Sequence, residues 1–439
     1  MLLWNILLVF TVAATMEKMV PKIAEKVHPN TTFVIFGTRH GHKHPDQYLK
    51  EHPNPTDNFE DDEKELSPFG KLEAYDMGRE IREFIGNLVG EQYNKSEAKF
   101  FSSSAVACQL TLQIVLAGLY PPKNEQHSWI KNPEWVPIPY TITDPMLRMF
   151  AMKNCPRAAE VWAPIHNETV EAMAQYTAGK KEVLEYIANN TGWNPSIAGG
   201  ADLAKNLISM KLHKTPFPDW ISHPRLANYD SNRLMREILE LDELSLEQCA
   251  LHEPCQDLMG GVWLQHILLL LKNASRHELN YKIVGYSTHT EIMLSLMRLL
   301  QLDIEGLTTS AGFLMEYRDY PYPSVRFLIH DPNPVESDSR IIRHATYTNK
   351  LKSYADSEQW IQLERFSDVV KDKGIWDWEA ACGKLTCTLD QAFVMVKTAS
   401  ETDLREEYYD KQTGQLKKQR KNLVVLAAGL ESMRGFLHL

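Results

Sequence analysis

The chain has 439 residues, 44% of them hydrophobic, and its formal net charge at pH 7 is -10. A chain of this length and apolar content can bury a large core and form more than one lobe. The net negative charge and the lack of a basic stripe exclude an ordinary nucleic-acid-binding protein. The only dense basic cluster, residues 417–421, is typical of a solvated helix face.

The N-terminal segment from Leu2 to Ala14 is apolar and ends in small residues. It is typical of a signal peptide, although no basic residues precede it, and we expect cleavage near Ala14 to remove residues 1–14. A retained anchor is the alternative, but the run is too short to span a bilayer. We therefore expect a secreted or lysosomal protein with no membrane span in its mature chain.

Five N-glycosylation sequons and six cysteines agree with passage through the secretory pathway. The sequons begin at Asn30, Asn94, Asn167, Asn189 and Asn273. An oxidising compartment favours disulfides, and by their short spacing we expect Cys249 to pair with Cys255 and Cys382 with Cys387. Cys108 lies in an apolar, helix-like run, and we expect it to be a buried free thiol.

Strand-like runs are each followed by a polar turn and a helical pattern, which is typical of parallel βα units. The strand-like runs are residues 33–37, 99–102 and 281–287, and the helical patterns include 110–119, 260–272 and 291–300. This order predicts an α/β fold with one central, mainly parallel sheet flanked by helices.

Between residues 129 and 257 the chain changes to aromatic, proline-rich and helical segments. We expect an inserted, mostly helical lobe there, because the α/β pattern resumes at Leu258. Residues 30–128 and 258–355 then form one discontinuous α/β domain. Residues 356–439 are charged and ambiguous, and their packing stays open.

The tripeptide Arg39-His40-Gly41 directly follows the apolar, β-branched run of residues 31–36. An α/β sheet binds its ligands beyond the carboxyl ends of its strands. An arginine there offers a planar receptor for a dianion, and a histidine beside it offers an imidazole. The pattern predicts a site for a phosphate ester.

Residues 39–45 resemble the R-H-G-x-R-x-P signature of the histidine acid phosphatases, in which the histidine is transiently phosphorylated. Similar stretches follow in the family's order at residues 65–70, 102–122, 260–261 and 286–289. The resemblance extends from residue 31 to about residue 330. It implies the histidine phosphatase fold, hydrolysis of phosphomonoesters at acidic pH, no cofactor, and a homodimer.

Part of the family's site is kept in this chain. By the resemblance, Arg39 matches the first phosphate-binding arginine, His40 the nucleophile, and His289 the second histidine at the phosphate. Lys43 stands where the family has its second arginine. Lysine keeps the positive charge but loses the fork that holds two oxygens at once, so we expect weaker, less oriented binding.

Other family residues are replaced. The family segment R-S-x-D-V-D-R aligns with residues 101–107, so Phe101 replaces a phosphate-binding arginine and Ser104 replaces an aspartate. Thr290 stands where the family has the aspartate that protonates the leaving alcohol. A threonine hydroxyl is too weak an acid for that role, and general acid catalysis is typically worth about 10² to 10⁴ in rate.

Two carboxylates, Glu291 and Asp331, are considered as replacements for the missing proton-donor aspartate. Glu291 follows Thr290, but one residue along a helix turns the side chain by about 100°, so Glu291 is a weak candidate for the proton donor. The dipeptide His330-Asp331 precedes a turn rather than a helix, and we expect a structural role for it.

The alternation of His40, His42 and His44 with Asp46 nearby is also compatible with a zinc site. Gly41 and Pro45 mark a turn at this point rather than a continuing strand, and the phosphatase resemblance explains His40 without metal. We therefore expect no metal or other cofactor.

Two functions agree with these residues. The first is an acid phosphatase whose activity is weak or lost. The second is a non-catalytic pseudophosphatase that binds an anionic ligand or a protein partner through the pocket of Arg39 and His40 or through the inserted lobe. The replacements at Phe101 and Thr290 are the features that decide between them.

Overall fold

The computed structural model describes residues 26–52, 65–122, 135–167, 169–212, 214–242, 244–304, 306–331, 341–383, 405–410 and 415–420. The chain divides into two compact units, Met1–Gly383 and Lys384–Leu439. The residues matched by the sequence patterns of the α/β fold all lie in the first unit.

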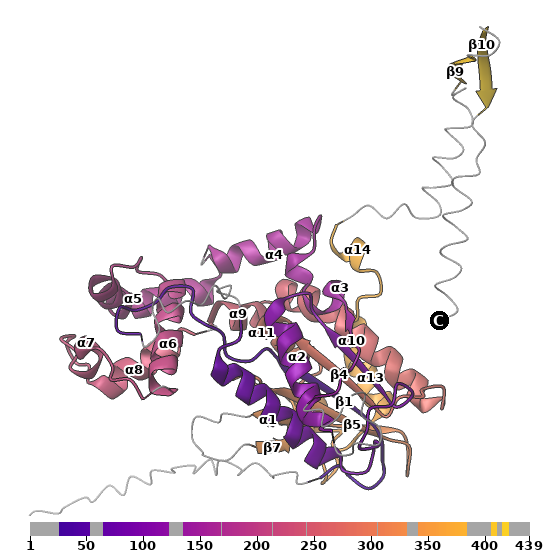
Figure 1. The fold of residues 1–439 in the computed structure, drawn as a ribbon, viewed down its shortest axis with the longest axis horizontal. Coiled ribbons are helices and arrows are strands. Elements are labelled where there is room, and N and C mark those ends of the chain that lie inside the picture. Colours follow the sequence, from indigo (N-terminus) through magenta and orange to yellow (C-terminus); the bar gives the residue numbers. More distant parts are fainter. Residues whose placement is uncertain are drawn as a thin grey trace, which may run out of the picture. The chain divides into compact units, whose positions relative to one another are not determined.

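The centre of the first unit is a mixed sheet in the order β3-β2-β4-β1-β5-β6-β7 (Figure 1). Its strands are β1 (Thr31–Arg39), β2 (Ala98–Ser102), β3 (Thr141–Ile142), β4 (Ile283–Thr288), β5 (Gly312–Arg318), β6 (Ser324–Asp331), β7 (Ile341–His344) and β8 (Ile361–Gln362), which pairs with β6. The half that contains β3, β2, β4 and β1 is parallel, and the other half is antiparallel. The predicted α/β fold is confirmed, and the predicted site lies on its parallel half.

Strand β1 is buried on both faces. It is rich in β-branched and aromatic residues, which favour strands. Phe33 and Ile35 join one hydrophobic core, and Val34 and Phe36 join the other. Helices that cover both faces of a parallel sheet account for this continuous apolar run.

The covering helices lie in pairs. α1 (Pro68–Ile85) and α2 (Val106–Leu119) lie side by side on one face, and α10 (Glu253–Ser275) and α11 (Thr290–Leu299) cover the other (Figure 1). Gly260 allows α10 to approach α11 closely, because a Cβ atom at this position would lie 2.8 Å from the backbone nitrogen of Leu296. The expected strands at 33–37, 99–102 and 281–287 and the expected helices at 110–119, 260–272 and 291–300 are confirmed, with small shifts at their ends.

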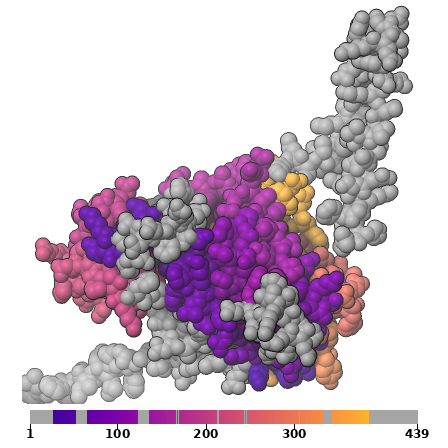
Figure 2. All heavy atoms as spheres, viewed as in Figure 1, coloured from indigo at the N-terminus to yellow at the C-terminus, as the bar shows by residue number. Residues whose placement is uncertain are grey.

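The chain between β3 and α10 is helical. Its elements are α3 (Asp144–Leu147), η2 (Met149–Ala151), α4 (Pro156–His166), α5 (Glu171–Thr191), α6 (Ile197–Leu212), α7 (Asp219–Ser222), α8 (Ser231–Leu239) and α9 (Leu244–Leu251). A third hydrophobic core joins α5, α6 and α8, and Leu49 packs into it from the segment after β1. Residues 26–52, in indigo, lie partly against the pink helical residues in Figure 2, and the backbone nitrogen of Leu49 donates to Asn206 Oδ1 at 2.9 Å. We propose that residues 129–257 form an inserted lobe.

The first unit ends with α12 (Asn349–Lys352), α13 (Leu363–Val370), η3 (Lys371–Lys373) and α14 (Trp378–Ala381). None of the described helices is long and apolar enough to cross a membrane.

In the second unit, β9 (Arg405–Asp410) and β10 (Gln415–Arg420) form an antiparallel pair. The helix expected at the basic cluster is therefore wrong over the described residues 417–420. In the register of this pair, Lys418 lies opposite Glu407.

Two disulfides lie within the described residues. Cys249 bonds to Cys255 as expected, and Cys108 is a buried free thiol as expected. The expected pairing of Cys382 is wrong, because Cys382 bonds to Cys155, which lies 227 residues away in sequence. Cys155 precedes α4 and Cys382 follows α14, and packing brings their Cα atoms to 4.6 Å. Cys387 lies outside the described residues.

The two disulfides should differ in their effect on stability. In the chain-entropy view a disulfide stabilises more when it closes a longer loop, which gives about 5 kcal/mol for Cys155–Cys382 and about 2 kcal/mol for Cys249–Cys255. We expect Cys155→Ala/Cys382→Ala to lower the free energy of unfolding more than the matched Cys249→Ala/Cys255→Ala variant. Urea unfolding under non-reducing conditions measures this, and an equal or reversed order contradicts the expectation.

Candidate active site

The predicted site lies at the carboxyl ends of the central parallel strands. β1 ends at Arg39, which pairs with Thr288 at the end of β4, and β2 ends at Ser102 beside β4. Because parallel strands end at the same edge of a sheet, the residues that follow them meet there. The structure brings the rings of His40 and His289 together, with their centroids 5.7 Å apart.

His40 is buried and held in one orientation. Its backbone nitrogen donates to Thr288 O at 2.9 Å, and its Nδ1 lies 2.9 Å from Gly41 O. A carbonyl oxygen only accepts, so Nδ1 carries the proton and Nε2 of the neutral ring keeps its lone pair. Burial lowers the pKa of His40 well below its usual value, and the positive charges of Lys43 and Arg39 lower it further.

Gly41 lies where the chain after β1 crosses the start of α1. A Cβ atom at Gly41 would lie 2.5 Å from Gly70 O, and one at Gly70 would lie 2.3 Å from His42 O. The backbone nitrogen of Gly41 donates to Thr111 Oγ1 at 3.0 Å, and that of Ser67 donates to His42 O at 2.9 Å. Because a side chain at Gly41 or Gly70 would clash with backbone atoms, only glycine fits this crossing. The crossing fixes the position of Gly41, whose carbonyl oxygen orients the His40 ring.

The two predicted cationic residues surround His40. Arg39 is buried, and its Nη1 donates to Leu307 O at 2.8 Å. Lys43 is half-buried, and its backbone forms a bridge with Leu66 near the start of α1. The positive charges of both residues lower the pKa of His40.

Phe101 belongs to the hydrophobic core. Its ring stacks on Tyr286 with centroids 5.2 Å apart and an interplanar angle of 10°, and it meets His266 edge-on at 5.4 Å. The side chain at this position is therefore packed between β2 and α10 rather than offered to a ligand.

His289 precedes α11 and faces the start of α2. Its Nε2 lies 3.2 Å from Ser103 Oγ and 3.6 Å from Cys108 Sγ. Thr290, the first residue of α11, is 1% exposed, and its Oγ1 is buried without a hydrogen-bond partner among the described residues. The position of the family's proton donor is thus inside the protein, beside His289.

Glu291 is also buried, in the first turn of α11. Burial raises the pKa of the Cys108 thiol to about 12, and the negative charge of Glu291 acts in the same direction. The charges of Lys43 and Arg148 act against this shift.

Arg148 is a residue of this region that the sequence patterns do not single out. It lies between α3 and η2, and its Nη1 donates to Ser104 Oγ at 3.1 Å. The neighbouring ring of Phe150 meets His289 edge-on, with centroids 5.1 Å apart. No local motif marks these residues, because only the folding of the helical segment brings them to the strand ends.

His42 and the dipeptide His330-Asp331 have hydrogen-bond partners that differ from those of His40. His42 is buried, and its Nδ1 lies 2.9 Å from Ser67 Oγ. Across the described residues, no three His, Cys, Asp or Glu side chains are placed to hold a metal ion. In His330-Asp331, His330 Nε2 lies 2.6 Å from Glu80 Oε2 and Asp331 accepts from Thr308 Oγ1, in agreement with the structural role expected for this dipeptide.

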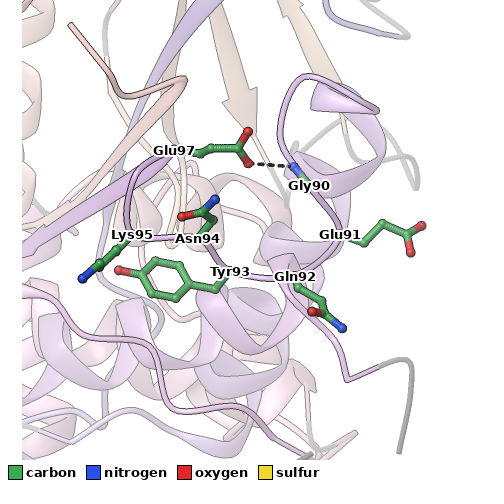
Figure 3. A pocket seen from close by; sticks show the side chains of 7 residues that line it. All are labelled: Gly90, Glu91, Gln92, Tyr93, Asn94, Lys95 and Glu97. Carbon is green, nitrogen blue, oxygen red and sulfur yellow. Dashed lines mark hydrogen bonds between the residues drawn. The ribbon is translucent and has the colours of Figure 1, made fainter. Parts of the chain in front are cut away.

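A surface hollow lined by residues 90–95 and Glu97 lies away from the two histidines (Figure 3). These residues precede β2, so they lie at the amino edge of the parallel strands, whereas His40 lies at the carboxyl edge. Glu97 Oε2 accepts from the backbone nitrogen of Gly90 at 3.1 Å within the hollow. Of the sequon asparagines, Asn273 is half-buried in α10 and the others are exposed: Asn30, Asn94, Asn167 and Asn189.

The buried histidine His42 predicts a loss of stability in acid. Burial lowers its pKa to about 3, whereas in the unfolded chain it titrates near 6.5. Below pH 6.5 the unfolded state binds a proton that the folded state does not, so the free energy of unfolding falls as the pH falls, by about 1.4 kcal/mol per pH unit for this group.

We expect His42→Gln to make the pH dependence of the urea unfolding free energy less steep between pH 6 and 4. The exposed His223, changed to Gln, is the matched control and should leave the slope unchanged. Parallel slopes for wild type and His42→Gln would show that His42 does not titrate in this way.

Comparisons with known proteins agree with this geometry. The model of the histidine phosphatase superfamily (branch 2) matches residues 11–315. The chain is 24% identical over 277 residues to prostatic acid phosphatase of Bos taurus, a match that covers 62% of this chain and 69% of that protein. It is 27% identical over 289 residues to lysosomal acid phosphatase of Xenopus laevis, with 62% of each chain covered.

Solved structures show the same fold at low sequence identity. The apo phytase of Hafnia alvei is 13% identical, with a TM-score of 0.57, and the match covers 81% of this chain and 99% of that one. Multiple inositol polyphosphate phosphatase of Bifidobacterium longum, in its inositol hexasulfate complex, is 12% identical, with a TM-score of 0.53 and coverage of 81% and 95%. The family match over most of the chain, together with the two histidines at the strand ends, identifies this protein as a member of branch 2 of the histidine phosphatase superfamily.

Proposed function

We propose that this protein hydrolyses phosphomonoesters at acidic pH through a phosphohistidine on His40, at a rate reduced by the replacements at Phe101 and Thr290. The observation that carries the proposal is the contact between His40 Nδ1 and Gly41 O at 2.9 Å, which leaves the Nε2 lone pair available. Burial lowers the pKa of His40 well below its usual value, which favours the neutral ring. A neutral imidazole is the form that can attack phosphorus.

The reaction then has two steps. In the first, His40 Nε2 bonds to phosphorus while the ester P–O bond breaks, and the leaving oxygen takes a proton. In the second, water attacks phosphorus, the P–N bond breaks, and inorganic phosphate leaves. Arg39, Lys43 and His289 are the groups that we propose to hold the phosphate oxygens, because stabilising their charge is the main task in phosphoryl transfer.

The leaving oxygen needs a proton donor in the first step. Thr290 is too weak an acid, so the proton comes from water or from another side chain. Glu291 is the candidate that we propose, because its carboxyl group is buried in the first turn of α11, directly after Thr290. A leaving group that needs little protonation, such as an aryl oxide, should be favoured.

The alternative is a non-catalytic protein that binds an anion or a protein partner in the same pocket. Phe101 favours it, since an aromatic ring packed on Tyr286 has replaced a phosphate-binding charge. Loss of one such donor costs about 10² to 10³ in rate, and loss of the acid costs a comparable factor.

The compartment and the assembly state are also proposals. The named relatives are prostatic and lysosomal acid phosphatases, and the two disulfides suit an oxidising compartment. We propose entry into the secretory pathway through residues 1–14, which lie outside the described residues, glycosylation at the five sequons, and a homodimer as the family resemblance implies.

His40 should be required for any turnover. We expect wild type to hydrolyse p-nitrophenyl phosphate slowly between pH 4 and 6 and His40→Ala to lose this activity, because the nucleophile is gone. His223→Ala, a change at an exposed histidine, is the matched control and should keep the wild-type rate. Equal background rates in wild type and His40→Ala would contradict the enzymatic proposal and favour the non-catalytic alternative.

Restoring an acid at position 290 should raise the rate. We expect Thr290→Asp to speed hydrolysis of an alkyl phosphate such as glycerol 2-phosphate by about 10²-fold or more, because general acid catalysis contributes on this scale. The gain with p-nitrophenyl phosphate should be smaller, since its leaving group is a weak base.

Thr290→Asn is the control, because it matches the aspartate in shape but donates no acidic proton. Equal rates for the Asp and Asn variants would mean that position 290 is not the missing acid. If Glu291 already supplies the proton, Glu291→Gln will lower the wild-type rate with glycerol 2-phosphate more than with p-nitrophenyl phosphate.

A further inference from the structure

The backbone of Arg148 is fixed beside the second histidine of the site. Thr288, the residue before His289, donates from its Oγ1 to Leu147 O at 2.7 Å, and this bond is buried. Leu147 and Met149, on either side of Arg148, are completely buried. The position of Arg148 relative to the end of β4 is therefore set by a hydrogen bond and by two anchors in the core.

The side chain of Arg148 extends toward the start of α2, which lines the site. Its Nη1 donates to Ser104 Oγ at 3.1 Å, and its guanidinium carbon lies 5.9 Å from the centre of the Phe150 ring, which contacts His289. Its charge also acts on the thiol of Cys108, whose Sγ lies 3.6 Å from His289 Nε2. Independent contacts thus place the guanidinium on the His289 side of the site.

No carboxylate of the described residues neutralises this charge. The serine hydroxyl is the only hydrogen-bond partner of the guanidinium there, and Arg148 Nε is buried without an acceptor. The nearby Asp144 uses its Oδ1 to accept from the backbone nitrogen of Ser104 at 2.7 Å. Ser104 stands where the resembling family has an aspartate, so the change at 104 has removed an acid that would lie against Arg148.

We propose that Arg148 binds a phosphate oxygen in this site and supplies the guanidinium that the change to Phe101 has removed. A guanidinium with unused N–H donors on the His289 side of the site is suited to the oxygens of a phosphate. The inference rests on the proposed function and adds to it a phosphate-binding residue from the helical segment after β3. It would give a second guanidinium to a site in which Lys43 and Phe101 stand at two of the family's arginine positions and Arg39 remains.

Binding of inorganic phosphate tests this without requiring turnover. We would measure the dissociation constant of phosphate at pH 5 by calorimetry for wild type, Arg148→Met and Arg148→Lys, with Arg157→Met as the control. Arg157 is an exposed arginine paired with Glu160 at 3.1 Å, outside the site. We expect Arg148→Met to weaken phosphate binding by about 10- to 100-fold, since hydrogen bonds to charged groups contribute on this scale, and Arg157→Met to have no effect.

Arg148→Lys should keep part of the affinity, because the charge remains while the planar fork is lost. The Arg148→Lys variant also serves as the test if Arg148→Met does not fold. If a folded Arg148→Met variant binds phosphate within about twofold of wild type, the inference is overturned. If Arg148→Met is unfolded, the inference is overturned when Arg148→Lys and the control both bind phosphate within about twofold of wild type. A wild type that binds phosphate through Arg148 but shows no His40-dependent turnover overturns only the enzymatic proposal, whereas a wild type that binds no phosphate overturns both.

Discussion

The parallel pairing of β1 with β4 is the contact on which the whole site depends. It sets Arg39 opposite Thr288, and the hydrogen bond from the backbone nitrogen of His40 to Thr288 O extends this pairing by one residue beyond the strands. Because β1 is buried on both faces, a slip by one residue would turn Phe33 and Ile35 toward the wrong core. The register that packs the apolar side chains therefore also places the two histidines opposite each other.

Relative to the family's pattern, Phe101 and Thr290 both put a neutral, buried side chain where the family has an ionisable one. A charged side chain at position 101 would need a partner inside the protein, whereas the phenyl ring of Phe101 gains a stacked contact with Tyr286. Thr290 puts a neutral hydroxyl where a buried carboxyl group would otherwise lie. Under the proposed function, these changes stabilise the folded core and weaken the binding of a phosphate.

The burial of His40 also affects the stability of the protein in acid. Burial and the positive charges of Lys43 and Arg39 lower the pKa of His40, so they oppose protonation of its ring in the folded state. The unfolded chain has no such restriction, so acid favours unfolding. A disulfide that joins the start of α4 to the end of α14 opposes unfolding by restricting the unfolded chain, and this suits a protein proposed to work at low pH.

The sequence by itself determined the α/β fold, the strand that ends at Arg39, and the disulfide between Cys249 and Cys255. Each of these depends on residues close together in the chain, through side-chain periodicity, a short motif or a short loop. Only the tertiary structure decided the pairing of Cys155 with Cys382, the strand at residues 415–420 and the place of Arg148 beside His289. These contacts join distant segments, and their partners are chosen by how strands pair and helices pack, which no local pattern records.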